Sequence, residues 1–327
     1  SKIDNGAMKI TDSPISLQNI SAEIEFSDTK GIVSDRLAAN LWGQTLSARL
    51  FKDNNRQQLS FNTKVMPENL NKFIDIPWDE LISGAIEINA LLANKSSNPK
   101  EGFGLNISSN LEGVAINLPA PFAKSKNSLK ELQVRLQFNP SLSRIESNLG
   151  ELWTSDIHYN LGQFDRGSIS FDRNNIRPDS NQFIIGAHLS TIDIEQWKPV
   201  TELFSANKKT SDGLQTEFDL HLDYWQIYGS RFENISAVIK PLTTNTEIVF
   251  SSDTAAGKVL LPVNSTKVPE VTLTKLMLEK NFDDSGQVMD PRNVTAVDFS
   301  VDQLFLAAKD LGSVSFQLRP EISGASF

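Results

Sequence analysis

Hydrophobic and polar residues alternate along most of the chain. In residues 20–26, Ile, Ala, Ile and Phe alternate with Ser and Glu, and in residues 132–138 Leu, Val, Leu and Phe alternate with Gln and Arg. Side chains on a strand point to opposite faces in turn, whereas helical neighbours recur at three and four positions. The alternation therefore predicts antiparallel strands with one apolar and one polar face. The same pattern occurs at 59–65, 86–92, 216–222, 235–239, 297–301 and 314–318.

Short polar segments separate these strands. Residues 28–31, 53–55, 172–175, 283–286 and 310–312 supply the Asp, Asn or Gly that tolerates a tight turn. A series of hairpins follows from them. Longer polar stretches at 95–101 and 206–213 are candidate linkers or long hairpin loops.

Only two segments have a helical pattern, and both predict short helices. The first covers residues 66–74 and the second residues 194–204. At the second, Asp193 and Gln196 can form a capping box, or Pro199 can stand at the first helical position. The predicted fold class is therefore all-β and mainly antiparallel, with two short helices.

Composition and charge exclude several classes of protein. The 327 residues include 31 Lys and Arg against 40 Asp and Glu, for a formal net charge of −9, and no Cys. An acidic chain lacks the positive field that nucleic-acid binding needs. Without Cys there are no disulfides, thiolate zinc sites, iron–sulfur clusters or thiol nucleophiles. The longest apolar run, 304–308, is far shorter than the ~20 residues that span a bilayer, so we expect the chain as given to be soluble.

Catalytic and metal-binding motifs are missing from the sequence. It contains no G-x-S-x-G elbow, phosphate loop, H-E-x-x-H or complete calcium loop. His158, His188 and His221 each lie in a predicted strand and could meet as metal ligands on adjacent strands. Isolated strand histidines more often lie at the surface or in a satisfied core. We therefore predict no catalytic residue, no metal site and no cofactor.

A glycan-active module is a distant alternative. Carboxylates on facing strands can act as a glycosidase pair. However, Glu23, Glu25, Asp219 and Asp223 fall on the polar sides of their strands, where charge is expected for solubility alone. Tryptophans can also stack on sugars, but the five in this chain are scattered, at Trp42, Trp78, Trp153, Trp197 and Trp225.

Residues 106–124, which read NISSNLEGVAINLPAPFAK, carry a family resemblance. They resemble the phrase S-(D/N)-L-x-G-(V/L)-x-(I/L)-x-L-P-x-P-(F/L)-x-K of the YhdP family, AsmA-like proteins of the Gram-negative envelope that are related to TamB. The segment from Leu118 to Pro121 is its most specific part. Residues 190–197 are similar to the family phrase L-D-(L/I)-x-x-W. Further similar stretches are 14–31, 38–43, 290–292, 296–304 and 310–314.

This resemblance implies a long twisted sheet curled into an open groove that passes phospholipid acyl chains between the inner and outer membranes. No enzymatic activity and no cofactor are implied. Family members begin with an inner-membrane anchor and are several times longer. We therefore expect a periplasmic fragment, monomeric by itself, that reaches both membranes through regions absent from this chain and begins at Ser1 for that reason. Three β units are expected, at 1–94, 95–205 with the Leu-Pro-Ala-Pro segment, and 206–327, in one elongated sheet.

The alternation supports a groove on physical grounds. A one-sided sheet in water must cover its apolar face with another sheet, a helix or a ligand. An acyl chain on such a face gains ~0.8 kcal/mol per buried methylene without any directional contact. The alternative is a closed β core that acts as a periplasmic scaffold in outer-membrane biogenesis. The residues predicted to line the groove are Ile20, Ile24, Phe26, Ile107, Val134, Leu136, Phe138, Phe218, Leu220, Leu222, Ile235, Phe299, Val301 and Phe316.

Overall fold

The computed structural model is mainly β and divides into two compact units. It describes residues 1–11, 13–72, 78–94, 102–139, 142–171, 176–206, 215–227, 230–264, 267–278, 296–307, 309–321 and 324–326. Unit 1 comprises Ser1–Ile169 and Asp193–Asp212, and unit 2 comprises Ser170–Ile192 and Gly213–Phe327. The turns predicted at 172–175 and 283–286, the linker at 95–101 and nearly all of the one at 206–213 lie outside the described residues.

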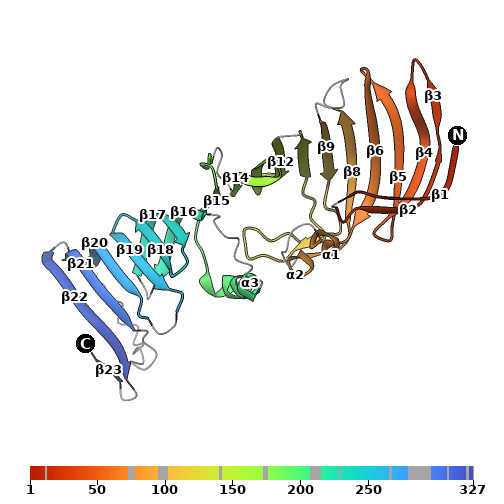
Figure 1. The fold of residues 1–327 in the computed structure, drawn as a ribbon. Helices are drawn as coiled ribbons and strands as arrows, with labels where there is room; N and C mark the ends of the chain where they lie inside the picture. Colours follow the sequence, from red (N-terminus) through yellow and green to blue (C-terminus); the bar gives the residue numbers. More distant parts are fainter. Residues whose placement is uncertain are drawn as a thin grey trace. The chain divides into compact units, whose positions relative to one another are not determined.

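Unit 1 is built on a sheet whose described pairs are all antiparallel (Figure 1). The pairing runs β1, β2, β4, β5, β6, β8, β9, β11, β12, β13 and does not close into a barrel. The strands are β1 (Lys2–Lys9), β2 (Ser16–Glu23), β3 (Glu25–Ser27), β4 (Gly31–Leu41), β5 (Gln44–Asp53), β6 (Arg56–Val65), β7 (Ile82–Ser83), β8 (Ile86–Asn94), β9 (Phe103–Ser109), β10 (Ala115–Ile116), β11 (Leu132–Phe138), β12 (Leu142–Leu149) and β13 (Trp153–Asn160).

The strands of unit 2 lie in an open sheet and combine antiparallel and parallel pairs. β15 with β16, and β20 with β21, are parallel, while the other described neighbours in this unit are antiparallel. β14 (Gln163–Phe171) crosses the boundary between the units. The other strands are β15 (Gln182–Leu189), β16 (Gln215–Ile227), β17 (Ser230–Pro241), β18 (Asn245–Ser251), β19 (Ala255–Pro262), β20 (Glu270–Leu278), β21 (Val297–Leu306), β22 (Lys309–Glu321) and β23 (Gly324–Ser326).

The described residues contain three short helices, one more than predicted. α1 (Pro67–Leu70) begins with proline as expected but ends sooner than the predicted helix at 66–74, and α3 (Ile194–Ala206) matches the predicted second helix. α2 (Trp78–Leu81) was missed because a single turn is too short to show a helical period. All three lie in unit 1.

The start of α3 agrees with the predicted cap at Asp193. Its carboxylate accepts a hydrogen bond from the Glu195 backbone N–H at 3.0 Å, and the Gln196 carboxamide donates to the same carboxylate at 2.9 Å. Pro199 lies inside the helix rather than at its first position. Side-chain capping by Asp193 therefore begins α3.

Tight turns explain why neighbouring strands of unit 1 pair as hairpins. Asn54 and Asn55 connect β5 to β6 with φ values of 47° and 61°. Two successive residues with positive φ form a turn whose twist matches the strands it joins. The predicted turn at 53–55 is thus confirmed, and with it the predicted all-β, mainly antiparallel fold.

Candidate functional site

A continuous aliphatic row crosses one face of the sheet in unit 1. In antiparallel pairs, residues directly opposite each other share a face, so the strand register defines which side chains line up. One row joins seven strands, and all its members are aliphatic and half-buried. We call it stripe 1, and it consists of Leu50, Leu59, Leu92, Leu105, Leu136, Ile145 and Ile157.

A second row lies beside stripe 1 on the same face. It starts at Ala22 in β2, reaches Val134 in β11 and ends on serines in β12 and β13. Neither row contains a charged side chain. The members of the second row are Ala22, Leu37, Ala48, Phe61, Ala90, Ile107, Val134, Ser147 and Ser155.

The opposite face of the same strands is polar and charged. One of its rows reads Asn62, Asn89, Ser108, Gln133 and Asn148. Two further rows share an ionic cluster, in which Arg144 Nε and Nη2 donate to the two Asp156 oxygens at 2.7 and 2.8 Å. His158 Nε2 lies 2.9 Å from Asp156 Oδ1. Partial burial opposes ionisation of Asp156, but hydrogen bonds from Arg144 and His158 outweigh it, and the pKa of this carboxyl is lowered.

Unit 2 has a corresponding row, stripe 2, across eight strands. Its parallel pairs continue the row through the same register. All members are apolar, and all are half-buried except Phe316, which is 39% exposed. The rings of Phe299 and Phe316 stack with centroids 4.9 Å apart. Stripe 2 consists of Ile185, Phe218, Ile239, Ile248, Val259, Val271, Phe299 and Phe316.

One end of the apolar face in unit 1 is covered by two long connections. Residues 66–85 join β6 to β8, and residues 110–131 join β9 to β11. Their described parts, which we call the cap, contain α1, α2 and the small ribbon of β7 with β10 (Figure 1). Between the cap and the sheet lies a core of residues that are at most 7% exposed, in which Leu111, Val114 and Ile116 come from the cap and Ile86 and Leu149 from the sheet. The apolar face is therefore sealed at this end and half-exposed along stripe 1.

The structure places most of the predicted groove residues on these two faces. Ile107 and Val134 oppose each other in the second row, Leu136 belongs to stripe 1, and the Phe138 ring lies 4.9 Å from Phe103. Ile20 packs against a small core around Ala39, Leu41 and Leu46. Ile24 lies between strands, and Phe26, in β3, is 73% exposed.

The unit 2 residues fall in three adjacent rows of one face. Phe218, Phe299 and Phe316 belong to stripe 2. Leu220 lies in the next row, which also holds Val301. Leu222 and Ile235 oppose each other beyond it, both 7% exposed. Three of these seven side chains, those of Leu222, Ile235 and Val301, are therefore buried.

Most members of stripe 1 are not among the residues that the sequence predicted to line the groove. Leu59 and Leu92 are in segments whose alternation predicted strands, yet neither was chosen as a groove residue. Alternation tells which side chains share a face within one strand. The register between strands, which lines these leucines up with Leu136, is set by the turns.

Two of the three histidines lie next to each other, and both are on the polar face. His188 and His221 oppose each other in β15 and β16, with ring centroids 6.4 Å apart. His188 Nε2 lies 2.9 Å from Asp223 Oδ1, and this hydrogen bond lowers the pKa of Asp223. Within the described residues no group of three or more His, Asp or Glu is arranged to hold a metal ion.

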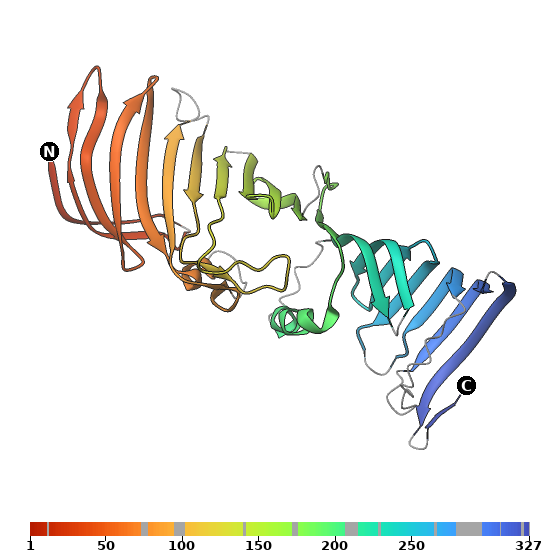
Figure 2. The same cartoon turned by 180° about the vertical axis from the view of Figure 1, so that it is seen from behind.

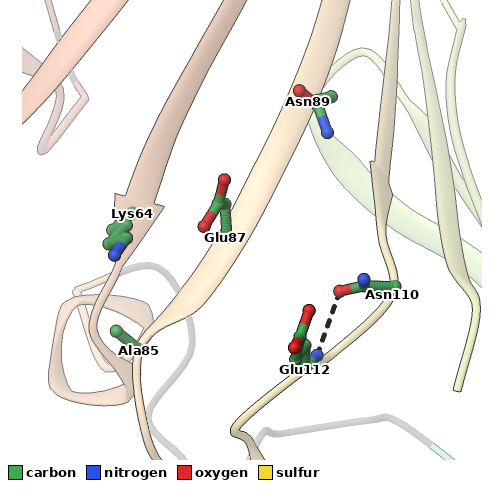
Figure 3. A pocket seen from close by; sticks show the side chains of 6 residues that line it. All are labelled: Lys64, Ala85, Glu87, Asn89, Asn110 and Glu112. Carbon is green, nitrogen blue, oxygen red and sulfur yellow. Dashed lines mark hydrogen bonds between the residues drawn. The ribbon is translucent and has the colours of Figure 1, made fainter. Parts of the chain in front are cut away.

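A pocket of about 330 Å³ opens on the polar face of unit 1 (Figure 3). Lys64 and Glu87 oppose each other in β6 and β8, and Asn89 follows along β8. Asn110 and Glu112, from the start of the 110–131 connection, complete the lining with Ala85. The Glu112 backbone N–H donates to Asn110 Oδ1 at 3.0 Å. This polar lining contrasts with the aliphatic face on the other side of the same strands.

The scan against protein families decides the relationship. The model described as YhdP protein matches residues 1–327. The chain belongs to the YhdP family. This family consists of AsmA-like proteins of the Gram-negative envelope. Neither the curated proteins nor the solved structures yielded a match. Among the residues that the structure describes, none of the helices has the length and apolarity to cross a membrane.

Proposed function

We propose that this YhdP-family chain carries phospholipid acyl chains along its apolar faces as a periplasmic part of a path between the inner and outer membranes. The proposal requires no covalent chemistry. The observation that carries it is the pair of stripes: each is an uncharged row across neighbouring strands whose side chains remain half-exposed. Contiguous exposed apolar surface is uncommon on soluble proteins and usually marks a binding surface.

The dimensions of stripe 1 suit an acyl chain. Neighbouring strands are ~4.8 Å apart, so a row over seven strands is roughly 29 Å long. This length is close to the ~30 Å hydrocarbon thickness of a bilayer, which holds two acyl chains end to end. Each methylene moved from water onto the face gains ~0.8 kcal/mol. An acyl chain that lies along the row would therefore have an apolar environment similar to that of the membrane interior.

The lack of charged side chains in the rows also suits movement rather than fixed binding. The hydrophobic effect has no direction and depends on the area removed from water. An acyl chain shifted by one strand contacts another Leu or Ile of similar size. Successive positions along stripe 1 thus offer similar free energies, so that no single site traps the lipid.

Photocrosslinking tests whether lipid lies on the predicted face. A photoreactive residue is placed at Leu136 in stripe 1 or Phe218 in stripe 2 of the full-length protein in cells. The matched controls are Gln137 and Asp219, the next residues along the same strands, on the polar face. We expect phospholipid adducts by mass spectrometry from the first pair and none from the second. Equal labelling of both faces, or no lipid from either, would contradict the proposal.

Charged substitutions test whether the face is used in transport. Leu136→Asp and Leu220→Asp each place a carboxylate among apolar side chains, which an acyl chain cannot solvate. We expect either variant to stop phospholipid delivery to the outer membrane while Gln137→Asp supports it, at matched protein levels. Normal delivery by both of these apolar-face variants would instead favour the alternative, a scaffold in outer-membrane biogenesis.

A further inference from the structure

The cap is far longer than its strands need. Val65 and Ile86 stand directly opposite each other, as do Ser109 and Leu132, so each pair of strand ends is already in register. Two residues suffice to connect antiparallel strands at such a point. Long connections in compact proteins usually have a function.

The two long connections also hold each other. β7 in the first pairs with β10 in the second, and the Asn117 backbone N–H donates to the Leu81 carbonyl at 2.8 Å. Figure 2 shows them together at one end of the strands of unit 1. The cap is thus a coherent layer over that end of the apolar face.

A buried lysine fastens the 110–131 connection. Lys124 is only 4% exposed, although lysine is almost never fully buried. Its ammonium donates three hydrogen bonds to backbone carbonyls: to Leu111 and Val114 at 2.7 Å each and to Ser125 at 3.2 Å. An ammonium has three donors, and all three are used. Burial lowers the pKa of Lys124.

The turn that this ammonium holds is strained. Leu111 has a φ of 50°, in the left-handed region that residues other than glycine adopt at a cost. Its side chain is 4% exposed and belongs to the core between the cap and the sheet. Ser109 Oγ accepts the Leu111 N–H at 3.1 Å, and Lys124 holds the Leu111 carbonyl. Such strain persists only where its surroundings enforce it, and Lys124 is a large part of those surroundings.

The choice of lysine is informative in itself. An apolar residue of similar volume would seal a permanent core without the cost of burying a charge. Here, by contrast, hydrogen bonds from a lysine hold a strained turn in place. The hydrogen bonds that keep the cap closed are therefore distinct from the apolar contacts that it covers. Together these features indicate that the hydrogen bonds of the Lys124 ammonium control whether the cap is closed.

We infer that the cap is a releasable cover over one end of the apolar face of unit 1 and that the Lys124 ammonium is its latch. Release would uncover Ile86 and Leu149 and extend the face that includes stripe 1. The role in lipid passage rests on the proposed function, whereas the latch itself is tested without lipid. The latch acts by positioning residues 111–114 and contacts no substrate.

Hydrogen exchange tests the latch directly on the whole chain. Lys124→Met keeps the length of the side chain and removes its charge, and Lys126→Met, at an exposed lysine two residues later, is the control. We expect the amides of Gly113, Ile116 and Lys130, which hydrogen-bond within this connection, to exchange at least tenfold faster in Lys124→Met. Amides of β5 and β6 should be unchanged, and the control should match the unsubstituted protein. Unchanged exchange in the cap, or an equal rise in β5 and β6, would overturn the latch.

Chemical rescue separates the charge from the packing. Lys124→Ala removes three methylenes and the ammonium, which together correspond in size to propylammonium. Added propylammonium should restore the slow exchange of the cap amides, while 1-propanol at the same concentration should not. Rescue by both compounds or by neither would show that packing, not the ammonium, closes the cap. Since these measurements contain no phospholipid, their failure would leave the crosslinking result intact, and the reverse also holds.

Discussion

Both units have an apolar sheet face, but the long connections between their strands differ. In unit 1 every described strand pair is antiparallel, and two long connections fold together over one end of the face. In unit 2 two strand pairs, β15 with β16 and β20 with β21, are parallel, and the connection at 190–214 that the first of them needs is counted largely with unit 1. A parallel pair requires such a crossover, whereas an antiparallel pair does not.

This difference separates connections that the strand topology requires from connections that it does not require. The crossovers that join the parallel strands of unit 2 would be needed for its topology even if they did nothing else. The cap of unit 1 is not needed to join its strands, so its polar fastening and its core call for another explanation. The following predictions test this contrast, from the largest expected effect to the smallest.

Core truncation should cost most where the cap lies over the sheet. Leu149, 0% exposed, is enclosed by strand neighbours and by cap residues, and Leu222 in unit 2 is 7% exposed. Substitution of a buried leucine by alanine costs ~2–5 kcal/mol, with larger values where the site cannot collapse. We expect Leu149→Ala near the upper end and Leu222→Ala near the lower end. Because a chain of two units has no single unfolding free energy, the measurement is hydrogen exchange in β12 and β16, and equal costs would refute the contrast.

Loss of one aromatic contact should loosen α3 from the cap. Trp197 meets Phe122 edge to face with ring centroids 5.6 Å apart, and Phe122 is 5% exposed. An aromatic pair contributes ~0.5–1.5 kcal/mol beyond its burial. Trp197→Leu should therefore raise exchange of the α3 amides several-fold. Lys198→Ala, which removes the exposed ion pair with Glu195 on the same helix, should change it little. Similar effects of the two variants would count against docking through Trp197.

Acid should weaken the β12–β13 hairpin of unit 1 through Asp156. Its pKa is lower in the folded chain than in the unfolded chain, so its stabilising contribution is complete above the unfolded value, about 3.9. The contribution is lost as the pH falls through the lower, folded value. Amide exchange in this hairpin, corrected for intrinsic pH dependence, should accelerate below about pH 4. Asp156→Asn should flatten that response, and an unaltered profile would disprove it.

The smallest effect is expected at the corresponding pair in unit 2. The pKa of Asp223 is lowered chiefly by its hydrogen bond with His188. In unit 1, Asp156 has Arg144 as well as His158. His188→Leu, which cannot donate this hydrogen bond, should therefore return the pKa of Asp223 toward its ordinary value, while His158→Leu should leave that of Asp156 low because Arg144 remains. Carboxyl NMR titration measures both, and a low pKa for Asp223 in the His188 variant would contradict this account.

The sequence predicted the strands and their faces well because alternation is local. Residues 132–138 and 216–222 formed the expected strands, with Leu136 and Phe218 on the apolar side. The parallel pairing of β15 with β16 was not predicted. The alternation of a strand is the same whether it pairs parallel or antiparallel. The direction of pairing depends on the path of the connection between the two strands.

The cap and its lysine were beyond prediction for different reasons. Residues 111–122 break the alternation with Leu111, Val114, Ile116 and Phe122 at irregular spacing, a signal that a non-strand element lies between β9 and β11. Lys124 is the last position of the family phrase, but nothing in the sequence signals its burial, since lysine in a polar stretch normally predicts exposure. Only the convergence of three carbonyls in the fold makes its burial favourable.

The parallel pairs also affect the order in which the chain can fold. The β5–β6 hairpin of unit 1 can close once its second strand has been synthesised, because its partners are neighbours in sequence. β15 cannot meet β16 until the 190–214 crossover exists, and loop closure costs more entropy as the loop lengthens. Through that interval the apolar residues of β15, Ile185 among them, have no strand on that side. This edge is where a nascent chain would need protection from mispairing.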